Sequence, residues 1–169
     1  DTTSSDPTDP NYSFLPIILD LGNDGLELVS LDESTAFFDV DDDGYRENVG
    51  WAGPDDGFLV IDLDGDGQID QAEELSFGAQ TELFDSDLEA LAANYDTNRD
   101  GVLDSNDADW AKFGVWQDQD QDGETDGGEF KSLDDMGITE IQLLSDGVVV
   151  EQDGNTILGS GQFTQNQQI

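Results

Sequence analysis

The charge balance is the feature that most constrains how this chain folds. Its 169 residues include 42 Asp and Glu against 4 Lys and Arg and no His, which gives a formal net charge of -38. Repulsion on this scale opposes a compact state unless cations offset it. Hydrophobic residues nevertheless make up 35% of the chain and aromatic residues 9%, which suffices for a modest core. We therefore expect the chain to fold together with bound cations.

The same composition excludes several classes of function. With 4 basic residues the chain lacks a surface that neutralises phosphates, so nucleic acid is not expected as a partner. The sequence has neither a run of about 18 apolar residues nor an apolar signal core, so membrane insertion is not expected. Because Cys and His are absent, disulfides, thiolate sites and the usual zinc ligands are excluded. Carboxylates are left to carry the function.

Three segments of twelve residues repeat the spacing of the EF-hand calcium loop. They are DLDGDGQIDQAE (62–73), DTNRDGVLDSND (96–107) and DQDQDGETDGGE (118–129). Such a loop turns at the Gly of position 6 and directs its oxygens toward one ion. At this Asp content the core of the pattern is expected by chance roughly 0.03 times in the chain. The ligands that we predict, with the backbone carbonyl at position 7, are Asp62, Asp64, Asp66, Gln68, Asp70 and Glu73; Asp96, Asn98, Asp100, Val102, Asp104 and Asp107; and Asp118, Asp120, Asp122, Glu124, Asp126 and Glu129.

Two positions in these repeats depart from the pattern. Asp107 takes the place of the closing Glu and is shorter by one methylene. Thr125 stands where Ile69 supplies an apolar anchor in the first repeat. The ligand set remains all oxygen with a carboxylate at the closing position, which suits Ca²⁺ better than the strict octahedron of Mg²⁺.

Two further segments match the pattern less well. In 39–50 the predicted ligands are Asp39, Asp41, Asp43, Tyr45 through its carbonyl and Glu47, but Gly50 occupies the closing position. Asp55 or Asp56 would have to supply the last carboxylate, and a plain turn is the alternative. In 20–27 the predicted ligands are Asp20 and Asp24, while Gly22 stands where another ligand is expected. The sequence therefore predicts three to five Ca²⁺ ions.

The rest of the sequence predicts an α+β fold, with short strands and short helices around EF-hand-like calcium loops. Short apolar runs that end at an acidic loop, such as 58–61, are typical of buried strands. We expect residues 1–13 to form a flexible linker and residues 14–169 to form one folded module. Helices are predicted over 86–95, from Ser105 or Asn106 to Phe113, and over 129–136, and a C-terminal β-meander of two hairpins follows Gly137.

The order of these motifs resembles the calcium-dependent self-processing module of RTX proteins, the type known from FrpC-like iron-regulated proteins. The resemblance runs from Pro16 to about Thr164, and its most specific parts are GW followed by PDDGFLV and VWQD before the last loop. It implies type I secretion and folding outside the cell. The chain would then be a calcium-binding module of a larger secreted or cell-surface protein, such as an adhesin, with neighbouring domains as partners.

In that family an Asp-Pro bond at the start of the module is cleaved when the Asp carboxylate attacks its own carbonyl carbon and the Pro nitrogen leaves. Here Leu15 precedes the matching Pro16, and leucine has no carboxylate. The resemblance therefore implies that this step is lost, and we predict no catalytic residue. Autocatalytic cleavage at Asp9-Pro10 or Asp6-Pro7 is the alternative, although an Asp-Pro pair in a linker is more often a turn.

A third hypothesis is calcium-dependent recognition of a protein or sugar ligand. Trp51, Trp110 and Trp116 would then provide an aromatic platform, whereas single Trp residues next to loops are more often part of a core. A calcium sensor that exposes a flexible apolar groove is disfavoured, because Met136 is the only Met.

Overall fold

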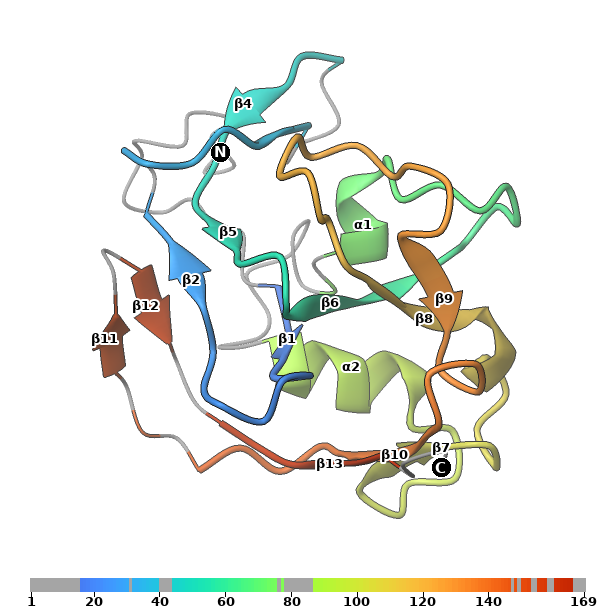
Figure 1. Cartoon of the computed structure of the whole chain (residues 1–169). Helices are drawn as coiled ribbons and strands as arrows, with labels where there is room; N and C mark the ends of the chain where they lie inside the picture. The colour runs from blue at the N-terminus through green and yellow to red at the C-terminus, as the bar shows by residue number, and fades with distance from the viewer. Residues whose placement is uncertain are drawn as a thin grey trace, which may run out of the picture.

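A computed structural model of the chain describes residues 16–30, 32–39, 44–75, 77, 87–146, 148, 150–152, 155–157 and 160–165 (Figure 1). The helices in these ranges are α1 (Ala72–Leu75), α2 (Asp87–Tyr95) and a 3₁₀ turn at Trp110–Lys112. The strands are β1 (Ile18–Leu19), β2 (Leu28–Val29), β3 (Phe37–Phe38), β4 (Glu47–Asn48), β5 (Trp51–Ala52), β6 (Gly57–Ile61), β7 (Val102–Asp104), β8 (Phe113–Trp116), β9 (Phe130–Ser132), β10 (Ile138–Gln142), β11 (Val150–Gln152), β12 (Asn155–Ile157) and β13 (Phe163–Gln165).

A four-stranded antiparallel sheet forms the centre of the molecule, in the order β1-β6-β8-β9. Strands β6 and β8 are paired over four residues, from Phe58 opposite Trp116 to Ile61 opposite Phe113. A second sheet has the order β13-β10-β7, and the remaining strands pair as β2-β5, β3-β4 and β11-β12. The central pair therefore joins segments that are more than fifty residues apart in the sequence.

Strand β6 separates two hydrophobic clusters. All five of its residues are buried, and alternate side chains of a strand point to opposite faces. Leu59 and Ile61 pack in the cluster that includes α2, β7 and β10, whereas Phe58 and Val60 pack in the cluster that includes α1, β3 and β5. The two helices accordingly lie on opposite sides of β6 (Figure 1). Each cluster supports a different set of acidic loops.

The expected α+β fold is wrong, because the described residues form mainly β-structure with two short α-helices. The helix predicted over 86–95 is present as α2, and Ser86 lies outside the described residues. The helix predicted up to Phe113 is replaced by the 3₁₀ turn and β8, and that predicted over 129–136 by β9 and a turn. Gly114, which directly follows that predicted helix, lies inside β8, where an added Cβ would come within 2.4 Å of the Lys131 carbonyl oxygen. Pairing within the central sheet thus outweighs a weak local helix preference.

The EF-hand arrangement of two helices around each loop is also not found among the described residues. Loop 62–73 follows β6, loop 96–107 follows α2, and loop 118–129 connects β8 to β9. The predicted C-terminal meander is wrong as well, because β10 pairs with β7 and β13 and not with β11. Its second hairpin is present as the separate pair β11-β12. The predicted linker 1–13, with Leu15 beyond it, lies outside the described residues.

Candidate metal sites in the acidic loops

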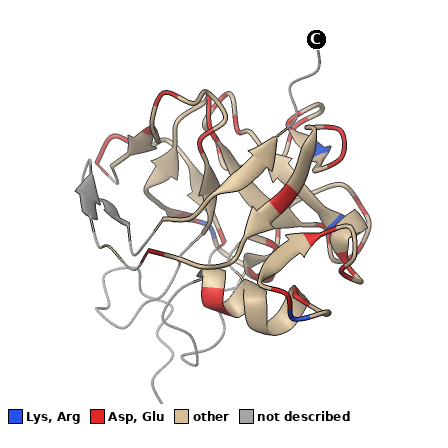
Figure 2. Ribbon diagram, turned by 90° about the horizontal axis from the view of Figure 1, so that it is seen from below, with Lys and Arg blue, Asp and Glu red and all other residues tan. Residues whose placement is uncertain are grey.

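Acidic residues are concentrated in the loops between the strands, as Figure 2 shows. The five loops predicted to hold calcium share one hydrogen bond, in which the N–H of the Gly at position 6 donates to the carboxylate of the Asp that opens the loop. Each of these glycines has a positive φ, between 77° and 104°. The five donor and acceptor pairs are Gly25 to Asp20 (3.0 Å), Gly44 to Asp39 (2.9 Å), Gly67 to Asp62 (3.0 Å), Gly101 to Asp96 (2.9 Å) and Gly123 to Asp118 (2.8 Å).

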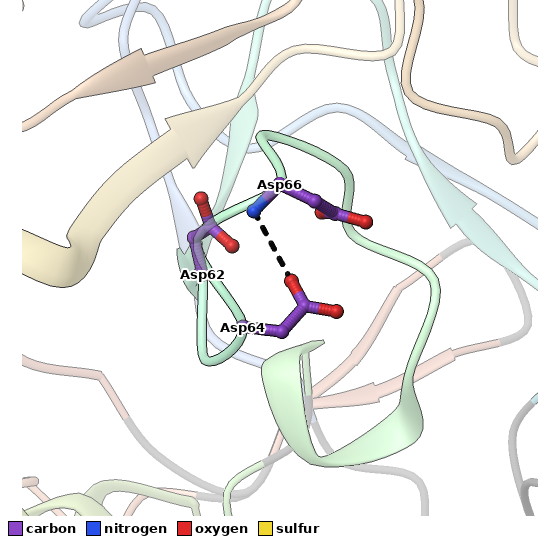
Figure 3. Close-up of side chains that lie close together, drawn as sticks. All are labelled: Asp62, Asp64 and Asp66. Carbon is purple, nitrogen blue, oxygen red and sulfur yellow. Dashed lines mark hydrogen bonds between the residues drawn. The ribbon is translucent and has the colours of Figure 1, made fainter.

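Among the described residues, loops 62–73 and 118–129 each bring three or more carboxylates together. In loop 62–73 one oxygen from each of Asp62, Asp64 and Asp66 lies within 4.8 Å of the others (Figure 3). In the same loop the N–H of Asp66 donates to Asp64 at 3.2 Å, the contact drawn as a dashed line in Figure 3. In loop 118–129 the same criterion groups two overlapping sets that share one residue, namely Asp118, Asp120 and Glu129, and Asp120, Asp122 and Asp126.

In each of the three twelve-residue repeats, 62–73, 96–107 and 118–129, a buried carboxylate closes the loop. It does so by accepting the backbone N–H groups of positions 2 and 9. In loop 118–129 it is Glu129, which accepts from Gln119 at 3.0 Å and Asp126 at 3.0 Å. In loop 96–107 it is Asp107, which accepts from Thr97 at 2.8 Å and Asp104 at 2.9 Å. The structure thus places both residues predicted at position 12 where they tie the two ends of their loop together.

Loop 62–73 is closed by a residue that the sequence pattern does not select. Glu74 is fully buried and accepts the N–H groups of Leu63 at 3.0 Å and Asp70 at 3.1 Å. Glu73, the residue predicted at position 12, is exposed. The closing carboxylate of this loop therefore stands at position 13, one residue later than the spacing predicts.

Loop 20–27 obtains its closing carboxylate from a distant turn. Asp56 is 1% exposed and accepts the N–H of Leu21 at 3.2 Å and the N–H of Glu27 at 2.7 Å. The sequence offered Asp56 as a last ligand for segment 39–50, but the structure ties it to the first loop instead. Asp24 contributes its N–H to Asp20 at 3.3 Å.

Segment 39–50 is described only in part, because Asp41 and Asp43 lie outside the described residues. Asp39 accepts the N–H of Gly44, Glu47 lies in β4, and the Tyr45 side chain is 76% exposed. The hydrogen bond from Gly44 to Asp39 is thus the same as the bond that the other four loops make.

Loop 118–129 is hydrogen-bonded to the aromatic cluster beneath it. The indole N–H of Trp51 donates to Asp118 at 2.7 Å, and that of Trp116 donates to Glu129 at 3.4 Å. The two indoles pack edge to face with ring centroids 5.5 Å apart. Trp110, which donates to Asp134 outside the acidic loops, is also buried. All three Trp side chains therefore belong to the core and do not form an exposed platform for a ligand.

Burial raises the pKa of several of these carboxyl groups. It raises the pKa of Asp118 to about 6, against the lowering effect of the N–H donors of Gly123 and Trp51. The pKa values of Glu74 and Asp56 are also raised by burial, although backbone N–H groups donate to both. Carboxylates that are buried close to one another are costly to ionise without a cation.

The donor sets fit a hard divalent cation. They consist of carboxylates, and the converging oxygens of Asp62, Asp64 and Asp66 lie as close together as ligands of one ion. Two basic residues in the described part of the chain have carboxylate partners at the surface, Arg46 with Glu124 and Lys112 with Asp109. Ca²⁺ is bound in proteins by six to eight oxygen ligands, and these carboxylates would supply part of such a set.

Three features of these sites escape reasoning from spacing alone. Glu74 directly follows the expected residue, and the adjacent pair Glu73 and Glu74 is the only signal in the sequence that either of them could close the loop. Asp56 belongs to the turn PDDG and is far from the loop it closes, so local spacing contains no signal for it. The indole donor Trp51 is likewise 67 residues away from its acceptor Asp118.

Comparison with known proteins finds both a matching domain family and a similar bacterial protein. The sequence profile of the SPM domain matches residues 17–168. The iron-regulated protein FrpA of Neisseria meningitidis serogroup C is 37% identical over 155 residues, which are 88% of this chain and 14% of FrpA. The chain thus spans about one seventh of this relative, and both matches agree with the resemblance to modules of RTX proteins. Of the helices that the structure describes, none has the length and hydropathy needed to cross a membrane.

Proposed function

Because this chain belongs to the SPM domain family, we propose that it is a calcium-binding module that folds when Ca²⁺ binds, within a larger secreted protein of the RTX type. One observation carries the proposal: five loops share the bond from glycine to the opening aspartate, and four of them are closed by a buried carboxylate. Loops of this kind hold their oxygens ready for one ion each. The expected load is three to five Ca²⁺ ions.

Charge explains why binding and folding are coupled. Without an ion the carboxylates of each loop repel one another, and the net charge of -38 opposes compaction of the whole chain. Each ion that binds only the folded state stabilises that state by RT ln(1 + [Ca²⁺]/Kd). Extracellular calcium modules bind at roughly 10⁻⁴ to 10⁻³ M, which would keep the chain unfolded before export and allow it to fold outside the cell.

Native mass spectrometry and circular dichroism of the intact chain test the proposal. In about 2 mM Ca²⁺ we expect three to five added ions and a gain of β-structure, both reversed by a chelator, and a weaker response to the same concentration of Mg²⁺. A chain that folds equally well in chelator, or that adds no calcium, would contradict it. Loss of the first nine or six residues when calcium is added would instead identify a self-processing module that cleaves at Asp9-Pro10 or Asp6-Pro7.

A further inference from the structure

We infer that loops 62–73 and 118–129 bind calcium cooperatively, because the side chain of Thr125 joins the backbones of the two loops. This inference rests on the proposed function, since it concerns how two of the proposed calcium sites act on each other. The N–H of Ile69 donates to the Thr125 hydroxyl at 3.0 Å, and the hydroxyl donates to the Ile69 carbonyl at 3.5 Å. The two residues are 56 positions apart in the sequence, and each stands at position 8 of its loop.

The two loops face each other at equivalent positions. Positions 7 to 9 of both loops line one cavity of about 320 Å³ together with Phe38, Asp39, Arg46 and Gly123. These positions are Gln68, Ile69 and Asp70 in one loop and Glu124, Thr125 and Asp126 in the other. At the centre of this contact Ile69 is 2% exposed and Thr125 is 7% exposed. The hydroxyl bonds are therefore sheltered from water, which would otherwise compete for them.

Position 8 is well placed to transmit the effect of an ion. In a loop of this type, position 7 supplies a carbonyl ligand and position 9 a side-chain ligand, so binding fixes the backbone on both sides of position 8. Since Thr125 holds Ile69 at both its N–H and its C=O, fixing one loop restricts the other. The second ion then meets a loop that is already ordered and has less conformational entropy to remove. Coupling of this kind acts equally in both directions.

This arrangement also explains why a polar residue replaces the apolar anchor in loop 118–129. An apolar residue in place of Thr125 would leave the N–H of Ile69 buried without this partner. In loop 96–107 the backbone at position 8 is paired differently, because Leu103 lies in strand β7 opposite Ile141 of β10. That loop is thus attached to a sheet and supplies a matched control.

The test reads calcium binding at loop 118–129 from the two Trp residues that donate to it. The titration is made in a stabilising osmolyte that keeps the chain folded throughout, as checked by circular dichroism, so that the midpoint reports binding and not folding. In a Trp110→Phe background, fluorescence comes from Trp51 and Trp116, whose indoles contact Asp118 and Glu129. We expect Asp64→Asn, which weakens loop 62–73, to raise the calcium midpoint of this signal about five-fold or more. In loop 96–107 position 3 is already Asn98, so the control is Asp100→Asn at position 5, which should leave the midpoint within about two-fold of its starting value.

Variants at Thr125 show whether its hydroxyl carries the coupling. With Thr125→Val, Asp64→Asn should raise the midpoint by less than about two-fold, whereas Thr125→Ser should preserve the full shift. The inference is overturned if Asp64→Asn leaves the midpoint unchanged, or if its effect is the same with Val as with Thr at position 125. The Asp64 and Asp100 variants decide the coupling even if Thr125→Val does not fold. An unaltered chain that binds no calcium in native mass spectra would instead refute the proposed function, while three to five bound ions without coupling would refute this inference alone.

Discussion

Loops 96–107 and 118–129 share a sequence pattern but differ in how they are attached to the rest of the molecule. Loop 118–129 accepts two indole N–H groups from the core, and its Gln121 side chain donates to the Ala52 carbonyl at 2.8 Å. Loop 96–107 instead contains strand β7, which pairs with β10. The Leu143 N–H also donates to its Gly101 carbonyl at 3.1 Å. Spacing thus determines the hydrogen bonds inside a loop, whereas its neighbours determine how far the effect of an ion spreads.

Replacing the glycine at position 6 by alanine should reveal the largest difference in stability between the two loops. In Gly123→Ala the new Cβ would lie 2.2 Å from the Phe37 carbonyl oxygen, while in Gly101→Ala it would meet nothing within 4 Å. Both glycines have a positive φ, so both changes cost about 1–2 kcal/mol in backbone strain. The clash should add about 1–3 kcal/mol in Gly123→Ala alone. Urea unfolding in saturating Ca²⁺ measures both, and equal losses would refute the claim that loop 118–129 is packed more tightly.

Adjacent acidic residues in loop 62–73 test which of them closes it. Glu74→Gln should reduce the free energy of unfolding in Ca²⁺ by about 2–3 kcal/mol, because it weakens charge-assisted bonds to buried N–H groups. Glu73→Gln should change it by less than about 0.5 kcal/mol, because this side chain is exposed. The spacing of the sequence motif predicts the opposite ranking. Denaturation in Ca²⁺ together with native mass spectrometry would show which variant loses an ion.

Removing an indole donor to loop 118–129 should lower both the stability of the fold and the affinity of this loop for calcium. Trp51→Phe removes the donor to buried Asp118 and should weaken the folded state by about 1–2 kcal/mol and raise the calcium concentration needed for folding. Trp110→Phe removes a comparable bond to Asp134, so it should lower stability without a selective loss of one ion. Ion counts in native mass spectra at limiting Ca²⁺ distinguish the two. Equal ion loss in both variants would contradict the special role of Trp51.

Acid should weaken loop 118–129 first, although the effect is the smallest of the four. Burial raises the pKa of Asp118 to about 6, so its protonated form, which cannot serve as an ionised ligand, is populated once the pH falls below that value. At about pH 5.5 roughly three quarters of this group is protonated in the metal-free fold, which should weaken calcium binding about four-fold relative to pH 7.5. The calcium midpoint of the Trp51 and Trp116 fluorescence measures this. A midpoint that stays constant across this pH range would rule out Asp118 as an ionised ligand.

Local features of the sites were predictable from the sequence, whereas their long-range connections were not. The positions of Asp and Gly predicted the loops because the turn at Gly is a property of a few neighbouring residues. The helix α2 was predicted for the same reason, from the local pattern in 86–95. These predictions depend on short stretches of chain whose geometry is set by their own residues.

The fold class was predicted wrongly because it depends on partners far away in the sequence. Residues 129–136 have a local pattern typical of a helix, yet Phe130–Ser132 pairs with β8 at the edge of the central sheet. Asp56 and Trp51 contact loops that are 29 and 67 residues away, respectively, and no local spacing encodes such contacts. Pattern reasoning therefore locates the hydrogen bond from Gly to the opening Asp of each loop but misses the distant residues that contact the loop.

The closure of loop 20–27 by Asp56 has a consequence for the order of folding. The other three closing carboxylates lie within about a dozen residues of the N–H groups they accept, so those loops can form as soon as their own segment is available. The bond from Leu21 to Asp56 spans 35 residues, and closing so long a segment requires a larger loss of chain entropy. We expect the first loop in the sequence to be the last to mature, so that the later calcium sites become rigid before the N-terminal part of the module does.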